Sequence, residues 1–252
     1  MSDNLQKRIV NSVEKIQYEE TQNFFKGRAS KFNEENPYSV TMYQDNNPQL
    51  VIERNIHEIS VLKPLLDLNE ESSVLDIACG IGRWADSINE NINKYCGIDF
   101  SPELIEIAHR RNRACEKKTF LVGAANETKR VLEENNQRKF NVVLLIGILM
   151  YLNEDDVIDT LMQIVDVLEE HAVICVREPV GLDNRLTLKN FYSQELNDNY
   201  NAIYRTRTEL MNIFKNTLLK NGFEITKEGF LFEKASLNNR SETEQYYYIF
   251  RR

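Results

Sequence analysis

The stretch VLDIACGIG, Val74 to Gly82, decides the fold of this chain, and GIDF, Gly97 to Phe100, follows it about one short helix later. The first segment reads as an apolar strand that ends in a glycine turn, and the second as another apolar strand that ends at Asp99. Glycine permits a positive φ and lets a ligand approach the backbone without a clash against Cβ. An acid at each strand end, Asp76 and Asp99, completes a unit typical of a site for an adenosine-containing cofactor.

The composition limits the class of protein. The chain has 252 residues, of which 42% are hydrophobic and 28% charged, as in one ordinary globular domain with or without an appended cap. The formal net charge is −8 and no segment is dense in Lys and Arg, so we expect neither a nucleic acid nor a membrane partner. The N-terminus lacks a signal core and no apolar run approaches the length of a membrane span, which predicts a cytoplasmic protein.

The cysteines point away from a metal site. Cys79, Cys96, Cys115 and Cys175 show no CxxC spacing, and no metal-ligand spacing joins them to the three histidines. All but Cys115 lie in or beside apolar strand patterns, where we expect buried thiols in a reducing compartment.

Apolar runs alternate with amphipathic segments from Ser72 onward, which is typical of an α/β fold with a mostly parallel, doubly wound sheet covered by helices. The expected strands are 74–78, 95–99, 119–122, 142–146 and 172–176, and the expected helices are 84–92, 102–113, 125–134 and 154–168. FEITKEGFLFEK and EQYYYIFRR predict two further strands joined by a polar loop. We expect residues 1–64 to form a helical cap, residues 65–252 the main domain, and a polar, aromatic insertion at about 178–221 a lid over the substrate.

Two cofactor classes compete for the glycine turn, because GIGRWA, residues 80–85, also fits the dinucleotide pattern GxGxxG/A of oxidoreductases. Three features argue against that class. Asp76 precedes the turn, where an acid disfavours a pyrophosphate; Arg83 and Trp84 are bulky where a diphosphate needs small residues; and the chain ends in a strand pair instead of a second mononucleotide-binding half.

From about Leu65 to Arg252 the chain resembles the class I, seven-stranded S-adenosylmethionine-dependent methyltransferases, most specifically in the D-x-x-C-G-x-G spacing. The resemblance implies a Rossmann-like sheet with an antiparallel strand near the C-terminus. It also implies that the methionine end of the cofactor is held by Asp76, Cys79, Gly80 and Gly82. By the same likeness, Asp99 holds the ribose and Phe100 packs on the adenine. Ala124 stands where the family usually has an adenine-binding acid, so we expect the Ala125 backbone or Asn126 to take that role, and the likeness implies that Ile146 lies under the cofactor. We also expect Tyr43, in the break at residues 42–44, to close over the cofactor, with an ordinary surface loop as the alternative.

The acceptor site is expected beyond the carboxyl ends of the strands. Methyl transfer is an in-line displacement that depends mainly on alignment and exclusion of water, and a hydroxyl acceptor gains from a base. Glu178, just past the expected fifth strand, is the candidate catalytic base, with a salt bridge to Arg177 or Arg185 as the alternative. The candidate substrate-binding residues are Tyr151, Arg177, Tyr204 and Arg205.

A second resemblance concerns the acceptor. NPYSVTMYQDNNP, REPVG with RLTLKNFYS, and NAIYRT look like segments of small-molecule methyltransferases of bacterial surface polysaccharide pathways. They imply a hydroxyl of a sugar or capsular precursor, in free or nucleotide-linked form. An amine of an amino sugar or another small amine, an NAD-dependent oxidoreductase, and a non-catalytic cofactor-binding subunit stay open as alternatives, as does the choice between monomer and homodimer.

Overall fold

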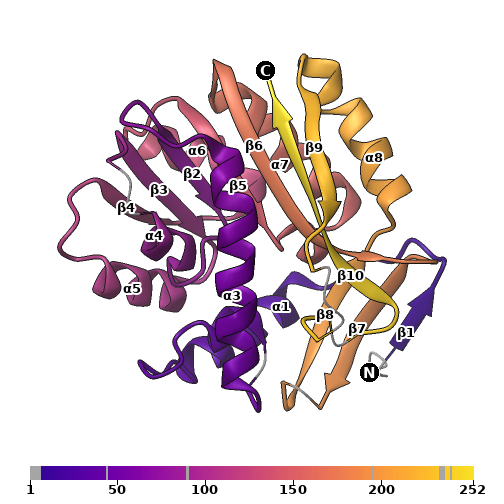
Figure 1. Cartoon of the computed structure of the whole chain (residues 1–252). Helices are drawn as coiled ribbons and strands as arrows, with labels where there is room; N and C mark the ends of the chain where they lie inside the picture. The colour runs from indigo at the N-terminus through magenta and orange to yellow at the C-terminus, as the bar shows by residue number, and fades with distance from the viewer. Residues whose placement is uncertain (1–6, 44, 89–90, 195, 233–235, 239) are drawn as a thin grey trace.

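A seven-stranded sheet with helices on both faces forms the body of the molecule, and a three-stranded sheet lies beside it in this computed structural model (Figure 1). The structure describes residues 7–43, 45–88, 91–194, 196–232, 236–238 and 240–252. The order of the large sheet is β4-β3-β2-β5-β6-β10-β9. Its strands are β2 (Ser73–Ile77), β3 (Lys94–Asp99), β4 (Lys118–Val122), β5 (Phe140–Ile146), β6 (Leu168–Gly181), β9 (Glu224–Phe230) and β10 (Thr243–Arg251).

The strands from β4 to β6 are parallel, and β10 pairs antiparallel with both β6 and β9. The order reverses at β2, whose neighbours are β3 on one side and β5 on the other. In sheets of this kind ligands bind beyond the carboxyl ends of the strands, at the reversal point. The α/β fold, the seven strands and the antiparallel C-terminal strand predicted from the sequence are therefore confirmed.

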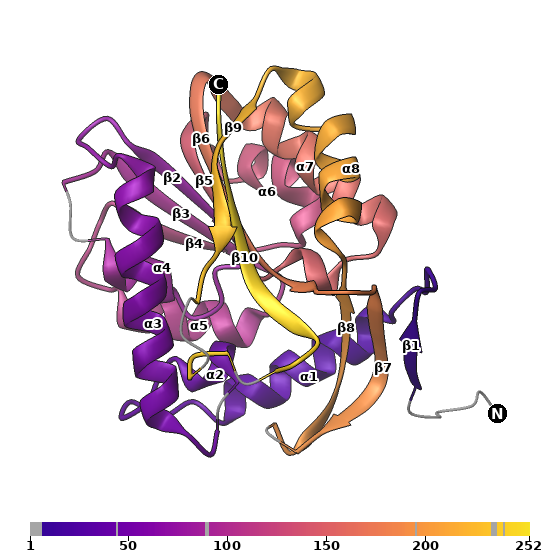
Figure 2. The same ribbon diagram turned by 45° about the vertical axis from the view of Figure 1, so that its right-hand side comes forward.

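Helices α3 (Pro48–Leu62), α4 (Arg83–Ser87) and α5 (Pro102–Arg111) cover one face, and α6 (Thr128–Glu134), α7 (Glu154–Val167) and α8 (Arg207–Asn216) cover the other, as Figure 2 shows with the sheet seen nearer its edge. Alternate strand residues serve the two faces. Val74 packs in the cluster that includes Trp84 of α4, whereas Leu75 and Ile77 pack in the cluster that includes Leu161 of α7. The described residues also include four short 3-10 turns: η1 (Lys63–Leu66), η2 (Ala125–Glu127), η3 (Leu149–Tyr151) and η4 (Leu219–Asn221).

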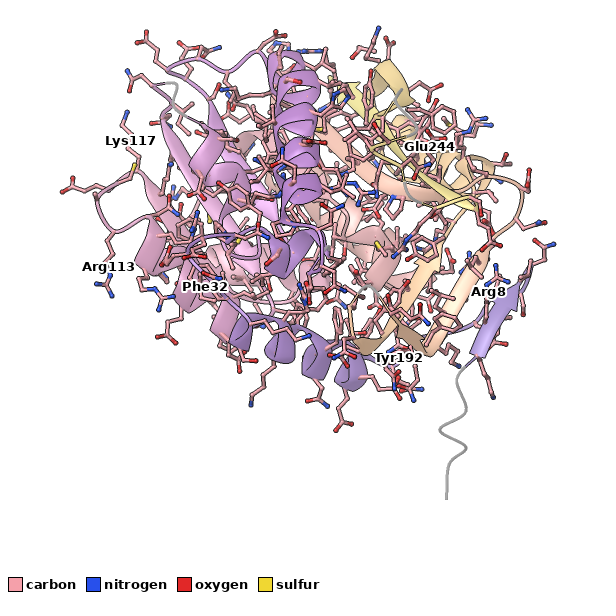
Figure 3. All side chains as sticks on the ribbon, turned by 60° about the horizontal axis from the view of Figure 1, so that its bottom comes forward. Arg8, Phe32, Arg113, Lys117, Tyr192 and Glu244 are labelled. Carbon is pink, nitrogen blue, oxygen red and sulfur yellow. The ribbon has the colours of Figure 1, made fainter. Side chains whose placement is uncertain are left out.

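The small sheet has the order β1-β7-β8, with β1 (Lys7–Val10), β7 (Leu186–Ser193) and β8 (Asp198–Tyr204) all antiparallel. Helices α1 (Tyr18–Ser30) and α2 (Ser39–Met42) follow β1 along the chain. Figure 3 looks at this end of the molecule, with Arg8 on β1 and Tyr192 on β7. Arg8 forms an ion pair with Glu242, which joins the first strand to the segment before β10.

Four expectations differ from the structure. Residues 7–10 form a strand within the segment expected to be a helical cap, and residues 178–221 form the end of β6, the β7–β8 hairpin, α8 and η4. The strand expected at 172–176 runs from Leu168 to Gly181, because Leu168 pairs with Phe140 of β5 and β10 gives the strand a ladder from Val173 to Gly181. The helix expected at 84–92 ends at Ser87, where Ile88 turns extended and buries its side chain. That the insertion acts as a lid stays a prediction.

Within the described part of the chain, no helix is both long and apolar enough to cross a bilayer. Over the same residues no group of His, Cys, Asp and Glu side chains is placed to hold a metal ion. The four cysteines are free, and Cys79, Cys96 and Cys175 are buried, as their apolar neighbours predict.

Candidate active site

A cavity opens at the carboxyl ends of β2, β5 and β6, between α2, α3, η3 and the β7–β8 hairpin. The loop after β2 supplies Ala78 and Cys79 to its lining, and the end of β5 supplies Ile146 and Gly147. Thr41, Met42 and Tyr43 line it from the α2 side. The cavity therefore lies where the reversal of strand order predicts a ligand.

The glycine turn after β2 is held in left-handed backbone conformations. Gly80 has a φ of 55° and Gly82 a φ of 78°. A Cβ on Gly80 would come within 2.8 Å of Cγ2 of Thr41, so α2 packs directly on the turn. Ala78 also has a positive φ, of 62°, although it carries a Cβ. This position favours glycine, so the turn holds local strain at Ala78.

Asp99 couples the end of β3 to the glycine turn. Its carboxylate is buried and accepts hydrogen bonds from the backbone N–H groups of Gly80 and Ser101, both at 2.9 Å. Burial raises the pKa of Asp99 to about 6, against the lowering effect of the two backbone hydrogen bonds. Asp99 is therefore mainly a carboxylate at neutral pH, as an acceptor for ribose hydroxyls must be.

Asp76 lies at the end of β2 and lines the cavity. Its carboxylate accepts a hydrogen bond from the hydroxyl of Tyr95. Burial raises the pKa of Asp76 to about 7, although the Tyr95 hydrogen bond and the charge of Arg83 lower it. A cation that reaches the cavity would favour the ionised form, so the group suits the ammonium of a methionine moiety.

Cys79 also lines the cavity and packs against Gly97, whose Cβ, if present, would lie 2.7 Å from Sγ. Burial raises the pKa of this thiol well above its usual range. The thiol is therefore protonated and serves in packing, because thiolates carry the reactivity of cysteine.

The residues expected around the adenosine lie outside the cavity lining. Phe100 meets the ring of Phe25 on α1 edge to face, with centroids 5.5 Å apart. Ala125 is buried in η2, and the Asn126 side chain donates to Asp156 of α7 at 2.6 Å. The Asn126 amide is thus engaged in a contact within the protein. The Ala125 backbone is therefore the better of the two candidates proposed to replace an adenine-binding acid.

Four tyrosines form an aromatic wall of the cavity. Tyr151 donates to the hydroxyl of Tyr43 at 3.0 Å, and the hydroxyls of Tyr200 and Tyr204 lie 3.1 Å apart. Burial raises the pKa of Tyr151 and of Tyr43 above the usual range, so both are neutral phenols. The structure therefore brings together Tyr43, Tyr151, Tyr200 and Tyr204 in the lining of one cavity.

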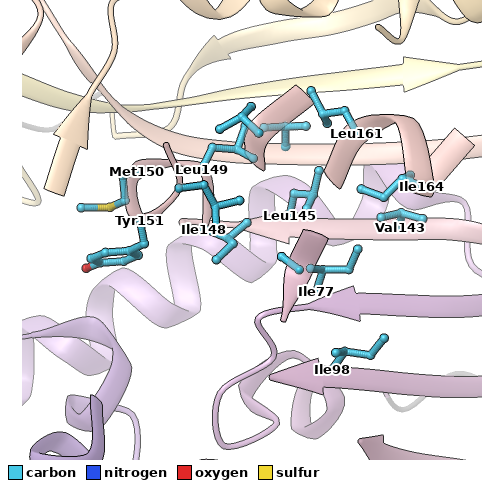
Figure 4. Packing of buried hydrophobic residues seen from close by; sticks show 14 of the residues in the cluster. Ile77, Ile98, Val143, Leu145, Ile148, Leu149, Met150, Tyr151, Leu161 and Ile164 are labelled. Carbon is cyan, nitrogen blue, oxygen red and sulfur yellow. The ribbon is translucent and has the colours of Figure 1, made fainter. Parts of the chain in front are cut away.

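Glu178 does not line the cavity. Alternate residues of β6 point to opposite faces of the sheet, so Arg177 faces the cavity and Glu178 faces away. Its carboxylate accepts from the backbone N–H groups of Ile148 and Leu149 at 2.8 Å and of Met150 at 3.1 Å. Figure 4 shows this run from Ile148 to Tyr151 beside β5. Burial raises the pKa of Glu178 to about 7. In place of the catalytic base expected from the sequence, the geometry makes Glu178 the group that positions η3 and hence Tyr151.

Arg205 is likewise bound within the protein. Its guanidinium pairs with Glu154 at 3.1 Å and donates to the carbonyl oxygens of Leu149 at 2.7 Å and Leu152 at 2.8 Å. Arg185 pairs with the same Glu154 at 2.6 Å. The expectation that Arg205 contacts substrate is therefore corrected: it fastens the far side of η3.

The sequence analysis missed a cluster of charged side chains on the α3 side of the cavity. Glu58 of α3 is buried and pairs with Arg83 of α4 at 2.6 Å and with Arg177 of β6 at 2.8 Å. It also accepts from the indole N–H of Trp84 at 3.0 Å. All four residues line the cavity. Only Arg177 was expected there, because nothing in the local pattern of α3 distinguishes Glu58 from its solvated neighbours.

The comparisons with known proteins agree with this site. Residues 74–171 match a family model described as a methyltransferase domain. No curated protein sequence matches the chain.

Solved structures show the same fold at low sequence identity. Phosphoethanolamine N-methyltransferase 1 of Haemonchus contortus, in complex with phosphoethanolamine and S-adenosylhomocysteine, superposes with a TM-score of 0.68 at 15% identity, over 94% of this chain and 50% of that one. This chain thus spans half the length of the Haemonchus chain. Mycolic acid cyclopropane synthase CmaA1, complexed with SAH, gives 0.64 at 11% identity over 96% and 100%. DhpI with SAH gives 0.61 at 15% over 92% and 95%.

The match of residues 74–171 to a methyltransferase domain favours a methyltransferase over the oxidoreductase alternative for the glycine turn. The sheet agrees, since β10 runs antiparallel where a second mononucleotide half would continue in parallel. Residues 74–171 of the chain match a methyltransferase domain, and the whole chain has the fold of solved methyltransferases crystallised with S-adenosylhomocysteine.

Proposed function

We propose that the chain transfers the methyl group of S-adenosylmethionine to a small acceptor held in the cavity at the carboxyl ends of β5 and β6. One observation carries the proposal: a single cavity is lined by Asp76 and Cys79 and also by Tyr151, Tyr204 and Arg177. The first group belongs to the cofactor turn and the second to the segments expected to bind the acceptor. A donor and an acceptor in one enclosed space are what an in-line displacement requires.

The protein residues divide the work between the two ligands. Asp76 would accept hydrogen bonds from the methionine ammonium, and Asp99 from the ribose hydroxyls. The bound cofactor supplies an electrophilic methyl group on a sulfonium. The aromatic wall of Tyr43, Tyr151, Tyr200 and Tyr204 would orient the acceptor and exclude water.

The tyrosine wall favours an acceptor rich in hydroxyl groups. Phenol rings stack on sugar faces and their hydroxyls both donate and accept hydrogen bonds. A sugar hydroxyl, in a free or nucleotide-linked sugar, is therefore the acceptor that we propose. An amine is the second candidate, because the similar Haemonchus enzyme is an N-methyltransferase seen with phosphoethanolamine. Among the described residues that line the cavity there is no histidine or lysine, so an amine would have to arrive uncharged.

Calorimetry with S-adenosylmethionine and S-adenosylhomocysteine tests the cofactor site. Wild type is expected to bind both. Asp99→Ala should weaken binding by about 1–3 kcal/mol, because ribose hydroxyls lose a buried acceptor. Asp159→Ala, which changes an exposed acid of α7, is the matched control and should leave the affinity unchanged. Absence of binding to either compound would refute the proposal.

A transfer assay with a labelled methyl group tests the acceptor. The panel contains nucleotide-linked sugars, free sugars, amino sugars and phosphoethanolamine. Transfer to a sugar hydroxyl supports the first candidate, and transfer to nitrogen supports the second. Full cofactor affinity without transfer to any member would favour the non-catalytic subunit instead.

A further inference from the structure

We propose that the cluster of Arg177, Arg83 and Glu58 binds an oxyanion group, phosphate-like or carboxylate, carried by the acceptor. The proposal rests on the proposed function and names the chemical class of its substrate. Glu58 stands between the two arginines and contacts Arg83 through Oε1 and Arg177 through Oε2. One carboxylate therefore serves two guanidinium groups in the wall of the cavity.

The cluster carries more positive than negative charge. Burial alone would raise the pKa of Glu58, but the charges of Arg177 and Arg83 outweigh it and lower the pKa, so Glu58 is ionised. Two cations and one anion give the cluster one net positive charge in a largely buried place, where the Arg83 side chain is 7% exposed and the Arg177 side chain 13%, and the charge of Arg83 also acts on Asp76. A buried surplus charge is costly unless another group pairs with it. Because the whole chain has a net charge of −8, this surplus is a local feature of the cavity.

Three neighbours define the position of the Arg177 side chain: Glu58, Gln245 and Gly147. Its Nη2 meets Glu58, and its Nη1 donates to Gln245 of β10 at 3.1 Å. Its Nη1 also lies 3.0 Å from the place of a Cβ on Gly147, so the absence of a side chain at Gly147 gives the guanidinium its space. Its Nε is buried and makes no hydrogen bond to any described residue. A fixed planar guanidinium is suited to oxyanions, which it binds through two parallel hydrogen bonds.

The position of Arg177 in the sheet assigns the cluster to the acceptor. The cofactor turn follows β2, and Asp99 ends β3, on the side of β2 away from β5. Arg177 and Gln245 come from β6 and β10, beyond β5 on the opposite side. The methionine carboxylate of the cofactor is the rival occupant, because Arg83 directly follows the glycine turn. The experiment must therefore separate the two oxyanions.

The full chain saturated with S-adenosylhomocysteine provides that separation, because the methionine carboxylate is then already in place. Inorganic phosphate and acetate are titrated separately at constant ionic strength. Trp84 is the only tryptophan of the chain and donates to Glu58, so its fluorescence reports on the cluster directly. Wild type should show saturable binding of at least one anion. Stronger phosphate binding indicates a phosphate-like group on the acceptor, and stronger acetate binding a carboxylate.

Arg177→Met should weaken anion binding about tenfold or more, the loss of one charge-assisted hydrogen-bond pair, and leave S-adenosylhomocysteine affinity unchanged. Arg130→Met removes an exposed arginine of α6 and is the matched control. Gln245→Met keeps both ion pairs of Glu58 and should weaken anion binding by a smaller factor. If Arg177→Met does not fold, this variant tests whether the cluster binds the anion.

Three outcomes overturn the proposal. The first is that wild type binds neither anion. The second is that Arg177→Met, or Gln245→Met if that variant does not fold, binds the anion as well as wild type. The third is that the variant loses affinity for S-adenosylhomocysteine and keeps the anion, which assigns the cluster to the cofactor. Failure of wild type to bind S-adenosylhomocysteine at all is a different result, because it refutes the proposed function itself.

Discussion

Replacing Asp76 by asparagine should stabilise the protein without ligand and weaken cofactor binding. Asp76 is buried at the end of β2, and burial raises the pKa of its carboxyl from an ordinary value of 3.8 to about 7. Between about pH 4 and about pH 7, the Asp76 carboxyl is therefore protonated in the native protein and ionised in the unfolded chain. Its contribution to stability is complete below about pH 4 and is lost as the pH rises through about 7. The amide that replaces the carboxyl cannot ionise and keeps an oxygen to accept from Tyr95.

The size of the effect follows from the width of that window. Each pH unit corresponds to about 1.4 kcal/mol for one proton, so about three units give about 4 kcal/mol as an upper value. The advantage of the variant should grow steadily between about pH 4 and 7 and level off above. Glu178, with a pKa of about 7, titrates in both proteins and cancels in the difference. Loss of a charged partner for the methionine ammonium should weaken cofactor binding by about 1.5–3 kcal/mol.

Urea unfolding of wild type and Asp76→Asn at several pH values measures the difference, and calorimetry measures the cofactor affinity. Asp159→Asn, at an exposed position of α7, is the control for loss of one negative charge. A difference in unfolding free energy that stays constant across the pH range would show that Asp76 ionises normally in the native protein. The reasoning from burial would then be wrong.

Three further substitutions test the turn, η3 and the cap, each by urea unfolding. Ala78→Gly should raise stability by about 0.5–1 kcal/mol. Glycine removes the cost of the left-handed φ of 62°, and its larger loss of conformational entropy on folding cancels only part of that gain. A loss of stability would contradict the strain. Near pH 4.5, where the raised pKa of Glu178 gives the amide no advantage, Glu178→Gln should lower stability by about 1–3 kcal/mol, because the amide NH2 cannot accept from the backbone N–H groups that the carboxylate binds. The variant should keep measurable methyl transfer, whereas a stable variant without any transfer would restore Glu178 as the base. Arg28→Met should cost about 2–4 kcal/mol, because the fully buried Arg28 joins α1 to Asp45 and the Val40 carbonyl; cofactor affinity should fall with it as Thr41 loosens from the glycine turn.

The cofactor half of the fold was predictable because its information is local. Buried parallel strands are continuous apolar runs, so four of the five expected strands lie within two residues of β2 to β5. The acid and glycine spacing placed Asp76 and Cys79 in the cavity lining. The last of the five strands was extended beyond expectation by β10, a partner that no local pattern reveals.

The acceptor half was less predictable because its polar residues are defined by distant partners. Glu178 and Arg177 are adjacent in sequence, yet the alternation of β6 sends one to η3 and the other to the cavity. Once residue 178 is placed in a strand, the two cannot share a role. Glu58 carries no local signal, since its partners come from α4 and β6. The strands β1, β7 and β8 were missed because they pair only with one another and carry polar residues on one side.

The place of β10 in the sheet has a consequence for synthesis and for cloning. It follows every other strand in the sequence, yet it lies inside the sheet, between β6 and β9. During translation the long edge of β6 stays open to other chains until β10 emerges, and open edges promote aggregation. The segment matched by the methyltransferase family ends at residue 171, within β6. A fragment cut there would lose most of β6 and all of β10, so residues 74–171 carry the family pattern but are not an independent folding unit.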